Sequence, residues 1–186
     1  MAAIDLGRPV SGDVIDLILQ DHRRFEELLR MLRDSSADRA GARSAFSALH
    51  VAHALAEEDV VYPKLRRKDA ITEHEAEHGS EEHAEGHQAL LALLELKGTD
   101  TQAFDDAVEA LATAVNHHLT EEELTILNPA REEVSEGART ELGTAFADAR
   151  NGHIDSGCGT LKQVRSLVAE ARREGLLESG EDPAEA

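Results

Sequence analysis

The stretch FSALHVAHALAEEDVVYPKL, residues 46–65, decides the fold class. Its apolar positions, among them Phe46 and Leu49, recur at the spacing of one helical face, and His53 and Glu57 lie on the same stripe. Residues four apart on a helix are offset by about 40° and about 6 Å, so these two side chains can converge on one ion. The stretch therefore predicts a helix that carries polar groups on its core-facing side.

Three more segments have the same helical periodicity. Capping residues, glycine and proline predict where the four helices begin and end. The first helix is capped by Ser11 or Asp13 and ends near Arg33, and the second follows the Ser-Ser-Ala-Asp break at 35–38 and ends near Lys68. The third begins near Ser80 and ends at Gly98, and the fourth is capped by Thr99 or Thr101 and ends at Asn128-Pro129. TEHEAEHGSEEH, residues 72–83, is polar, acidic and interrupted by Gly79, so we expect a connection there. Short connections between helices of similar length predict an all-α, antiparallel up-down four-helix bundle.

The chain divides into three predicted parts. Residues 11–130 form the bundle, and residues 131–175 form a C-terminal helical extension with helices near 141–150 and 161–173. The two extension helices flank the glycine-rich stretch NGHIDSGCG, residues 151–159. The end of the chain, residues 176–186, is expected to be a disordered tail.

Composition excludes several classes of function. The formal net charge of -19 repels phosphate backbones and anionic lipid headgroups, so neither nucleic acid nor a membrane surface is an expected partner. A single cysteine forms neither an internal disulfide nor a cysteine-based metal cage. The N-terminus has no apolar signal region, which predicts a cytoplasmic protein.

The ten histidines are the outlier of the composition. Seven His and Glu residues fall on the predicted core-facing stripes of the four helices: His22, His53, Glu57, His83, His87, His118 and Glu122. Burying these groups without partners would cost several kcal/mol. A metal centre is the simplest way to satisfy them.

The number of donors favours two iron ions. Two six-coordinate ions have about twelve positions, and the seven side chains with a bridging hydroxide would fill about eleven of them. One position stays open for a ligand. Imidazole-rich sites with some carboxylate suit iron better than Mg²⁺ or Ca²⁺, while Zn²⁺ prefers four ligands.

These motifs resemble the hemerythrin-like, or HHE cation-binding, family. Its pattern H, HxxxE, HxxxH, HxxxE on successive helices is matched by His22, HALAE at 53–57, HAEGH at 83–87 and HLTEE at 118–122. EEDVVYP at 57–63 and HHLTEEE at 117–123 are also similar to the family. The resemblance covers about residues 13–130 and is specific, because four separate helices must agree.

The resemblance implies a ligand assignment. His22 and His53 would hold one iron, and His83, His87 and His118 the other, while Glu57 and Glu122 would bridge them with a hydroxide or oxo group. Oxygen-carrying hemerythrins end the pattern with HxxxxD, and the HxxxE of this chain weakens the case for reversible oxygen carriage.

The resemblance also implies a function. We expect a non-haem di-iron protein that binds O2, NO or peroxide at an open iron position, in an oxidative or nitrosative stress response. Two alternatives use the same site: catalase-like decomposition of peroxide, and iron storage or sensing.

Two other metal-site motifs compete with this interpretation. His74 to His78 read HExxH, the zinc metalloprotease signature, but their flanks are acidic and Gly79 follows, which argues against a protease. A ferritin-like site needs two Glu-x-x-His motifs on bundle helices, and only Glu75 and His78 have that spacing.

Several other residues have open roles at this stage. His74 and His78 rival His83 and His87 as the third-helix pair, although only the latter lead into the leucine face. His50 and His117 lie close to predicted ligands, and each either supports the site or is a solvated or hydrogen-bonded histidine. Glu58, Glu121 and Glu123 are most simply a solvated acidic face. Cys158, near His153, is a redox thiol or a small residue without chemistry.

Overall fold

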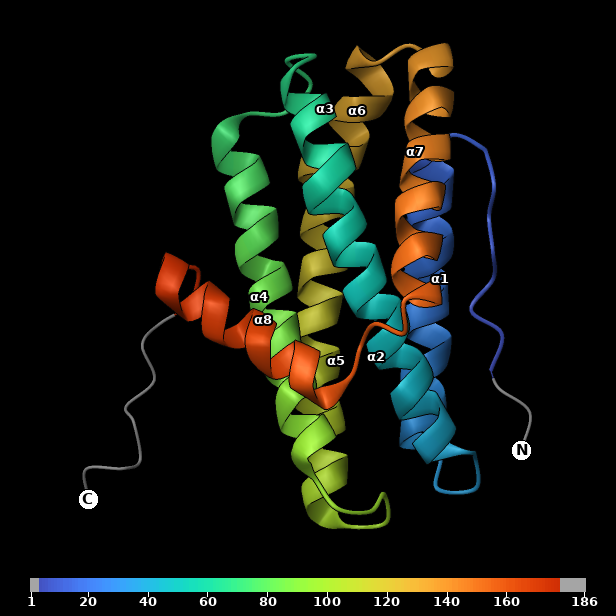
Figure 1. Ribbon diagram of the computed structural model, residues 1–186, viewed down its shortest axis with the longest axis vertical. Helices are drawn as coiled ribbons and strands as arrows, with labels where there is room; N and C mark the ends of the chain where they lie inside the picture. The colour runs from blue at the N-terminus through green and yellow to red at the C-terminus, as the bar shows by residue number, and fades with distance from the viewer. Residues whose placement is uncertain (1–3, 178–186) are drawn as a thin grey trace.

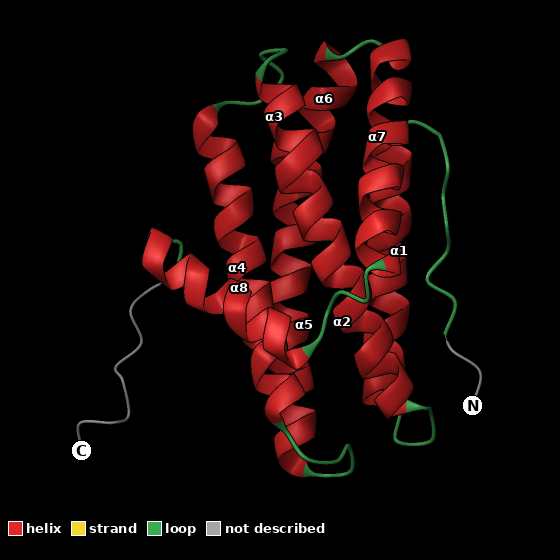
Figure 2. Ribbon diagram, in the orientation of Figure 1, coloured by secondary structure: helices red, strands yellow, loops and turns green. Residues whose placement is uncertain are grey.

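The computed structural model describes residues 4–177 and is all-helical within them (Figures 1 and 2). Four long helices pack into an antiparallel up-down bundle: α1 (Val14–Arg33), α2 (Arg39–Ala56), α4 (Glu73–Glu95) and α5 (Gln102–Glu122). Each contacts its two neighbours around the ring, α1 with α2, α2 with α4, α4 with α5, and α5 with α1. The predicted fold class is confirmed.

Side-chain caps fix where the first and fourth of these helices begin. Asp13 accepts a hydrogen bond from the Ile15 backbone N–H at 3.0 Å, and Thr101 accepts one from Phe104 at 3.2 Å. Each cap satisfies a backbone donor that has no partner inside the helix. Of the alternatives left open by the sequence, Asp13 and Thr101 are therefore the observed caps.

Helix α4 begins seven residues earlier than predicted, since Glu73 and not Ser80 is its first residue. The prediction that residues 72–83 form a connection is wrong. Thr72 and Glu75 make a reciprocal capping box that starts the helix. The helix also passes through Gly79, because tertiary packing offsets a propensity cost of about 1 kcal/mol.

Two π-helical turns lengthen α2 and α5 beyond the bundle. After α2, η1 (Glu57–Val61) leads into α3 (Tyr62–Arg66), and after α5, η2 (Glu123–Leu127) leads into α6 (Asn128–Glu133). The predicted helix end at Asn128-Pro129 is therefore wrong. Pro129 lies in the first turn of α6, where its missing N–H costs little.

The C-terminal extension packs directly on the bundle. Helix α7 (Glu136–Asp155) lies along α1 and α2, and α8 (Leu161–Glu174) crosses α4 (Figure 1). Gly143 allows the close approach of α7, since a Cβ there would meet the Gly12 carbonyl oxygen at 2.0 Å. Both helices are longer than the predicted ones. The predicted tail lies outside the described residues except for Leu176 and Leu177.

The core consists of two main apolar clusters, and the buried polar side chains of the predicted stripes lie between them. Phe25 belongs to one cluster and Phe146, from α7, to the other. The ring of His53 lies between both, with centroids 5.1 Å from Phe25 and 5.8 Å from Phe146. The buried polar groups therefore sit in the middle of the bundle.

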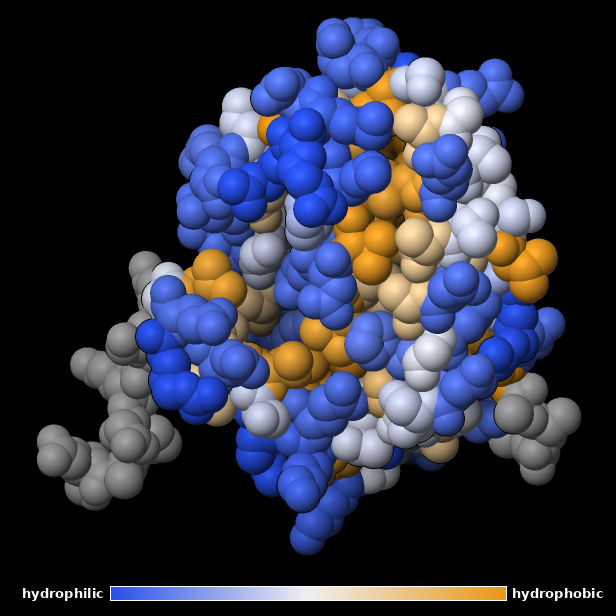
Figure 3. All heavy atoms as spheres, turned by 45° about the horizontal axis from the view of Figure 1, so that its top comes forward, coloured by the Kyte–Doolittle hydropathy of each residue, from blue (hydrophilic) through white to orange (hydrophobic). Residues whose placement is uncertain are grey.

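The face seen in Figure 3 is mostly hydrophilic, with hydrophobic side chains gathered in a band near its middle. This agrees with the formal net charge of -19. Among the described residues, no helix combines the length and the hydropathy that a membrane crossing requires.

Candidate metal centre

All seven predicted ligands are buried inside the bundle, and none is more than 5% exposed. They come from four helices and the first π-helical turn: His22 from α1, His53 from α2, Glu57 from η1, His83 and His87 from α4, and His118 and Glu122 from α5. Side chains of these types are seldom fully buried unless they are paired or bind a metal.

The structure brings six of the seven together in two groups. In each group, one ligand atom per residue lies within 4.8 Å of the others: His22, His53 and Glu122 in the first, and Glu57, His83 and His118 in the second. Each group combines two imidazoles with one carboxylate. Such a donor set suits a transition-metal ion.

The two carboxylates connect the groups. Oε2 of Glu57 lies 3.2 Å from Nε2 of both His53 and His83, which belong to different groups. Oε2 of Glu122 lies 3.1 Å from His22 Nε2 and, across the centre, 3.7 Å from His118 Nε2. Both carboxylates therefore lie where they can bridge two cations.

His87 is the predicted ligand that belongs to neither group. Its Nε2 is buried without a hydrogen-bond partner, and its ring meets that of His50 edge-on at a centroid distance of 5.0 Å. Burial lowers the pKa of His87 to about 4, with a further contribution from His83. The side chain is thus neutral and has a free nitrogen beside the second group.

Atoms without partners are concentrated at this centre. Among the described residues, the buried side-chain atoms that lack a hydrogen bond include Nε2 of His53, His83, His87 and His118 and both carboxylate oxygens of Glu57. An unsatisfied buried polar atom costs about 1–3 kcal/mol. Metal ions would satisfy all of these atoms at once, so the donor set fits a cation centre.

A second layer of carboxylates holds the imidazoles from behind. In four histidines Nδ1 contacts a carboxylate oxygen: His22 with Glu123 at 3.0 Å, His53 with Asp21 at 3.2 Å, His83 with Glu58 at 2.8 Å and His118 with Glu82 at 3.1 Å. Such contacts fix the tautomer and leave Nε2 free for a metal.

This layer corrects one expectation and adds residues to the site. Glu58 and Glu123 are not merely solvated, because each contacts a predicted ligand. Glu82, which is buried on α4, is a site residue that the sequence did not predict. Its position next to His83 in the sequence does not indicate a role, because its carboxylate contacts His118 on the neighbouring helix α5.

The charges of the centre shift the pKa values in opposite directions. Burial raises the pKa of Glu57 to about 8, and the neighbouring Glu122 charge adds to this. Burial would also raise the pKa of Glu122, but hydrogen bonding to His22 and the charge of His118 outweigh it and hold that pKa well below its usual range. Without metal, one of the two carboxylates therefore carries a proton.

Tyr62 adds a hydroxyl group to the centre. Its O–H donates to Oε1 of Glu122 at 3.2 Å, and its ring stacks on His83. Gly79 makes room for it, because a Cβ there would lie 2.9 Å from the Tyr62 hydroxyl oxygen. The glycine that interrupts the helical pattern of α4 thus has a packing role.

Both π-helical turns begin at the centre. Glu57 is the first residue of η1, and Glu122 immediately precedes η2. In each turn a backbone N–H bonds back five residues, from Tyr62 to Glu57 and from Asn128 to Glu123. Turns of this kind are frequent at functional sites.

The other histidines divide by exposure. His50 is buried against His87, and Gly86 leaves room for it, since a Cβ there would lie 2.8 Å from His50 Nε2. His74 is exposed and the His78 side chain is 44% exposed, so the HExxH segment does not form a buried metal site. His117 is exposed as well, with 59% of its side chain accessible.

Cys158 has a structural contact. Its thiol donates to the Ala48 carbonyl at 3.2 Å, and burial raises its pKa, so the reactive thiolate form is disfavoured. His153 points elsewhere, 3.9 Å from Asp59.

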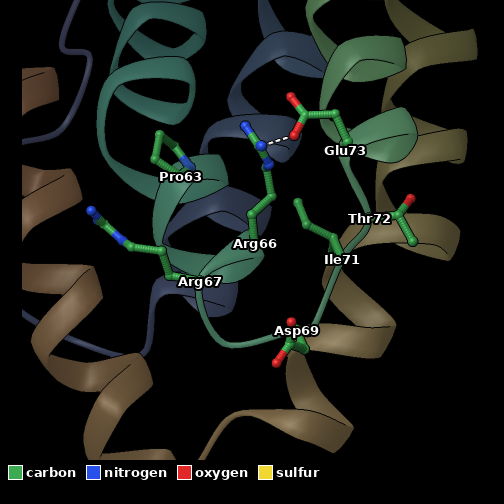
Figure 4. Close-up of a pocket in the computed structure, with 7 residues that line it drawn as sticks. All are labelled: Pro63, Arg66, Arg67, Asp69, Ile71, Thr72 and Glu73. Carbon is green, nitrogen blue, oxygen red and sulfur yellow. Dashed lines mark ion pairs between the residues drawn. The ribbon is translucent and has the colours of Figure 1, made fainter.

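A cavity of about 240 Å³ borders the centre. His87 and Glu58 line it, together with Glu170 and Leu176 from the C-terminal part of the chain. A larger cavity of about 540 Å³ lies at the turn between α3 and α4 (Figure 4). No predicted ligand lines it, and an ion pair between Arg66 and Glu73 spans it.

Comparison with known proteins agrees with this geometry. Searches of curated proteins and of solved structures gave no significant match. The family model of the hemerythrin HHE cation-binding domain matches residues 13–130, which include all seven predicted ligands. The chain therefore belongs to the hemerythrin HHE cation-binding family.

Proposed function

We propose that the centre holds two iron ions and binds a small ligand, O2, NO or peroxide, in a response to oxidative or nitrosative stress. The proposed ligands are the seven predicted residues, with Glu57 and Glu122 as bridges next to a hydroxide or oxo group. When bound, iron supplies redox chemistry and an open position for the ligand. The observation that carries the proposal is the set of partnerless Nε2 and carboxylate atoms.

The protein's own residues prepare this centre. The carboxylates behind the imidazoles fix which nitrogen faces inward, and this raises the basicity of the ligands. The apolar packing of Phe25 and Phe146 around His53 excludes bulk water from that side. Ligands reach the centre through the cavity lined by His87 and Glu58.

Peroxide decomposition is the second candidate function, and one observation favours it. Glu58 and Glu123 contact buried imidazoles, while their side chains are 33% and 47% exposed. Each can exchange a proton between solvent and a ligand histidine. Peroxide turnover needs such proton transfer, and simple storage of iron does not.

Metal analysis after anaerobic iron loading tests the proposal. We expect about two irons per chain, because seven converging donors exceed what one ion accepts. His118→Ala should lower this number, whereas His117→Ala, its exposed neighbour, should leave it unchanged. A single zinc per chain that His118→Ala does not affect would refute the di-iron centre.

A further inference from the structure

We infer that Arg150, on helix α7 and outside the family-matched residues, is a positioning residue of the metal centre that acts through Asp21 and His53. This inference rests on the proposed function, because it assigns His53 a metal. It makes the C-terminal extension part of the centre and not only a cover for it.

Arg150 is fully buried and uses every donor of its guanidinium group. It clamps the Asp21 carboxylate with two hydrogen bonds, Nε to Oδ2 at 2.7 Å and Nη2 to Oδ1 at 2.8 Å. The other three N–H groups donate to the Leu6 and Gly7 carbonyls and to the Asn151 side chain. A bidentate clamp of this kind fixes both the position and the plane of a carboxylate.

Asp21 passes this constraint to a predicted ligand. Its Oδ2 atom accepts from Nδ1 of His53 at 3.2 Å, so the proton stays on Nδ1 and the Nε2 lone pair faces the centre. The two hydrogen bonds from Arg150 hold the Asp21 carboxylate in the position from which it accepts from His53.

His53 differs in this respect from the other three histidines with a carboxylate behind them. Among the residues that the structure describes, Glu58, Glu82 and Glu123 form ion pairs with histidines and none with a lysine or arginine. Glu58 and Glu123 are also partly exposed and can be reoriented by water. The imidazole of His53 is thus the one held by a buried ion pair from a fifth helix.

The chain contains a matched ion pair that separates this role from simple docking of α7. Arg139 on α7 donates to Asp13, the cap of α1, at 2.7 Å. Within the described part of the chain, the other side-chain hydrogen bonds of these two residues go to backbone groups and not to a predicted ligand. Removing either arginine loosens α7 from the bundle. Only the loss of Arg150 frees the carboxylate behind His53.

The test compares Arg150→Gln, Arg150→Lys and Arg139→Gln in the full chain loaded with iron. The readouts are the rate of iron loss to a strong chelator and the visible absorption of the diferric protein with azide as a probe. For Arg150→Gln we expect about 10–100-fold faster loss of one of the two irons, the usual effect of removing a residue behind a ligand, and an altered azide spectrum. Arg150→Lys keeps the positive charge and should lose iron more slowly than Arg150→Gln. Arg139→Gln should have the same rate of iron loss and the same azide spectrum as the unmodified chain.

Two further results keep the test decisive. If Arg150→Gln does not fold, Asp21→Asn and Arg150→Lys report on the same contact, and both should speed iron loss. If the unmodified chain binds two irons but the Arg150 and Arg139 variants lose iron at its rate, the inference fails and the proposed function stands. If the unmodified chain binds no iron, the proposed function itself fails.

Discussion

At the scale of single residues, the centre holds its histidines in different protonation states. Burial lowers the pKa of His22 and of His83, but their carboxylate partners outweigh it and raise these values to about 9 and about 10. Burial lowers the pKa of His53 to about 4 despite the neighbouring Asp21. In the metal-free chain at neutral pH, His22 and His83 are therefore cations and His53 is neutral.

This arrangement predicts how the stability of the metal-free protein depends on pH. A group whose pKa is higher in the folded state stabilises the fold below its unfolded pKa and loses that contribution as the pH rises through the folded pKa. The stabilisation by His22 is lost between pH 6.5 and about 9, and that by His83 between pH 6.5 and about 10. The stabilisation by protonated Glu57 is lost between pH 4.5 and about 8. The melting temperature of the metal-free protein should therefore fall between pH 6.5 and pH 9.

The metal-loaded protein is the control, because bound cations replace these protons. The metal-loaded protein has the same titratable groups outside the centre, and it should melt at nearly the same temperature at pH 6.5 and at pH 9. A metal-free protein that is equally stable at pH 6.5 and pH 9 would contradict the assigned protonation states.

The candidate ligands could be named from the sequence, because a spacing of four on an apolar stripe is a property of the sequence alone, and the structure brings six of the seven into two groups. Glu58 and Glu123 were misjudged because their contacts run between helices. Arg150 lies 129 positions from Asp21, and no local pattern links them. Contacts of this kind depend on how the extension packs.

At the scale of helices, Gly79 shows why the start of α4 was misplaced. In isolation, glycine inside a helix is unfavourable, and a break was the reasonable expectation. The capping box at Thr72 and the space needed by Tyr62 reverse that preference. The π-helical turns were equally hidden, since a one-residue shift in bonding leaves the apolar pattern almost unchanged.

Two glycine substitutions test this account. Gly79→Ala should destabilise the protein, because its Cβ would lie 2.9 Å from the Tyr62 hydroxyl oxygen and displace the donor to Glu122. The cost should be about 1–3 kcal/mol, typical of overpacking. Gly152→Ala in α7 meets nothing within 4 Å and should instead stabilise by about 0.5–1 kcal/mol. Urea unfolding of the metal-free variants measures both, and equal effects at the two positions would contradict a packing role for Gly79.

At the scale of the whole molecule, the centre lies where the two main apolar clusters meet. Without cations the buried Glu57 and Glu122 face each other across partnerless imidazoles. A metal ion that binds the folded chain and not the unfolded chain stabilises the fold by about 4 kcal/mol when the free metal concentration is about a thousand times the dissociation constant. For a chain of this size that corresponds to about 8–16 °C in melting temperature.

We therefore expect the iron-loaded protein to melt well above the metal-free protein. Calorimetry at pH 7 on both forms measures the difference. His118→Ala should reduce it, whereas His117→Ala should leave it intact, since that side chain is exposed. Equal melting temperatures with and without iron would mean that the proposed ligands do not share a metal site.

The surroundings of the proposed di-iron centre favour turnover of peroxide over the holding of oxygen. A dry pocket without proton donors favours reversible binding. Here Phe25 and Phe146 keep one side dry, but Glu58 and Glu123 connect buried imidazoles to solvent, and a cavity of about 240 Å³ reaches Glu58. Protons and water therefore have access to the centre.

We predict that the diferrous protein oxidises rapidly in oxygen and decomposes peroxide at a measurable rate. Stopped-flow spectra on mixing with oxygen, and then with peroxide, follow both reactions. Glu58→Gln should slow peroxide turnover per bound iron, because its amide no longer accepts a proton. Glu121→Gln, on the same acidic stretch as Glu123, should have little effect. If the diferrous protein instead holds oxygen for hours and releases no oxygen from peroxide, the path through Glu58 carries no protons and the centre acts as a carrier.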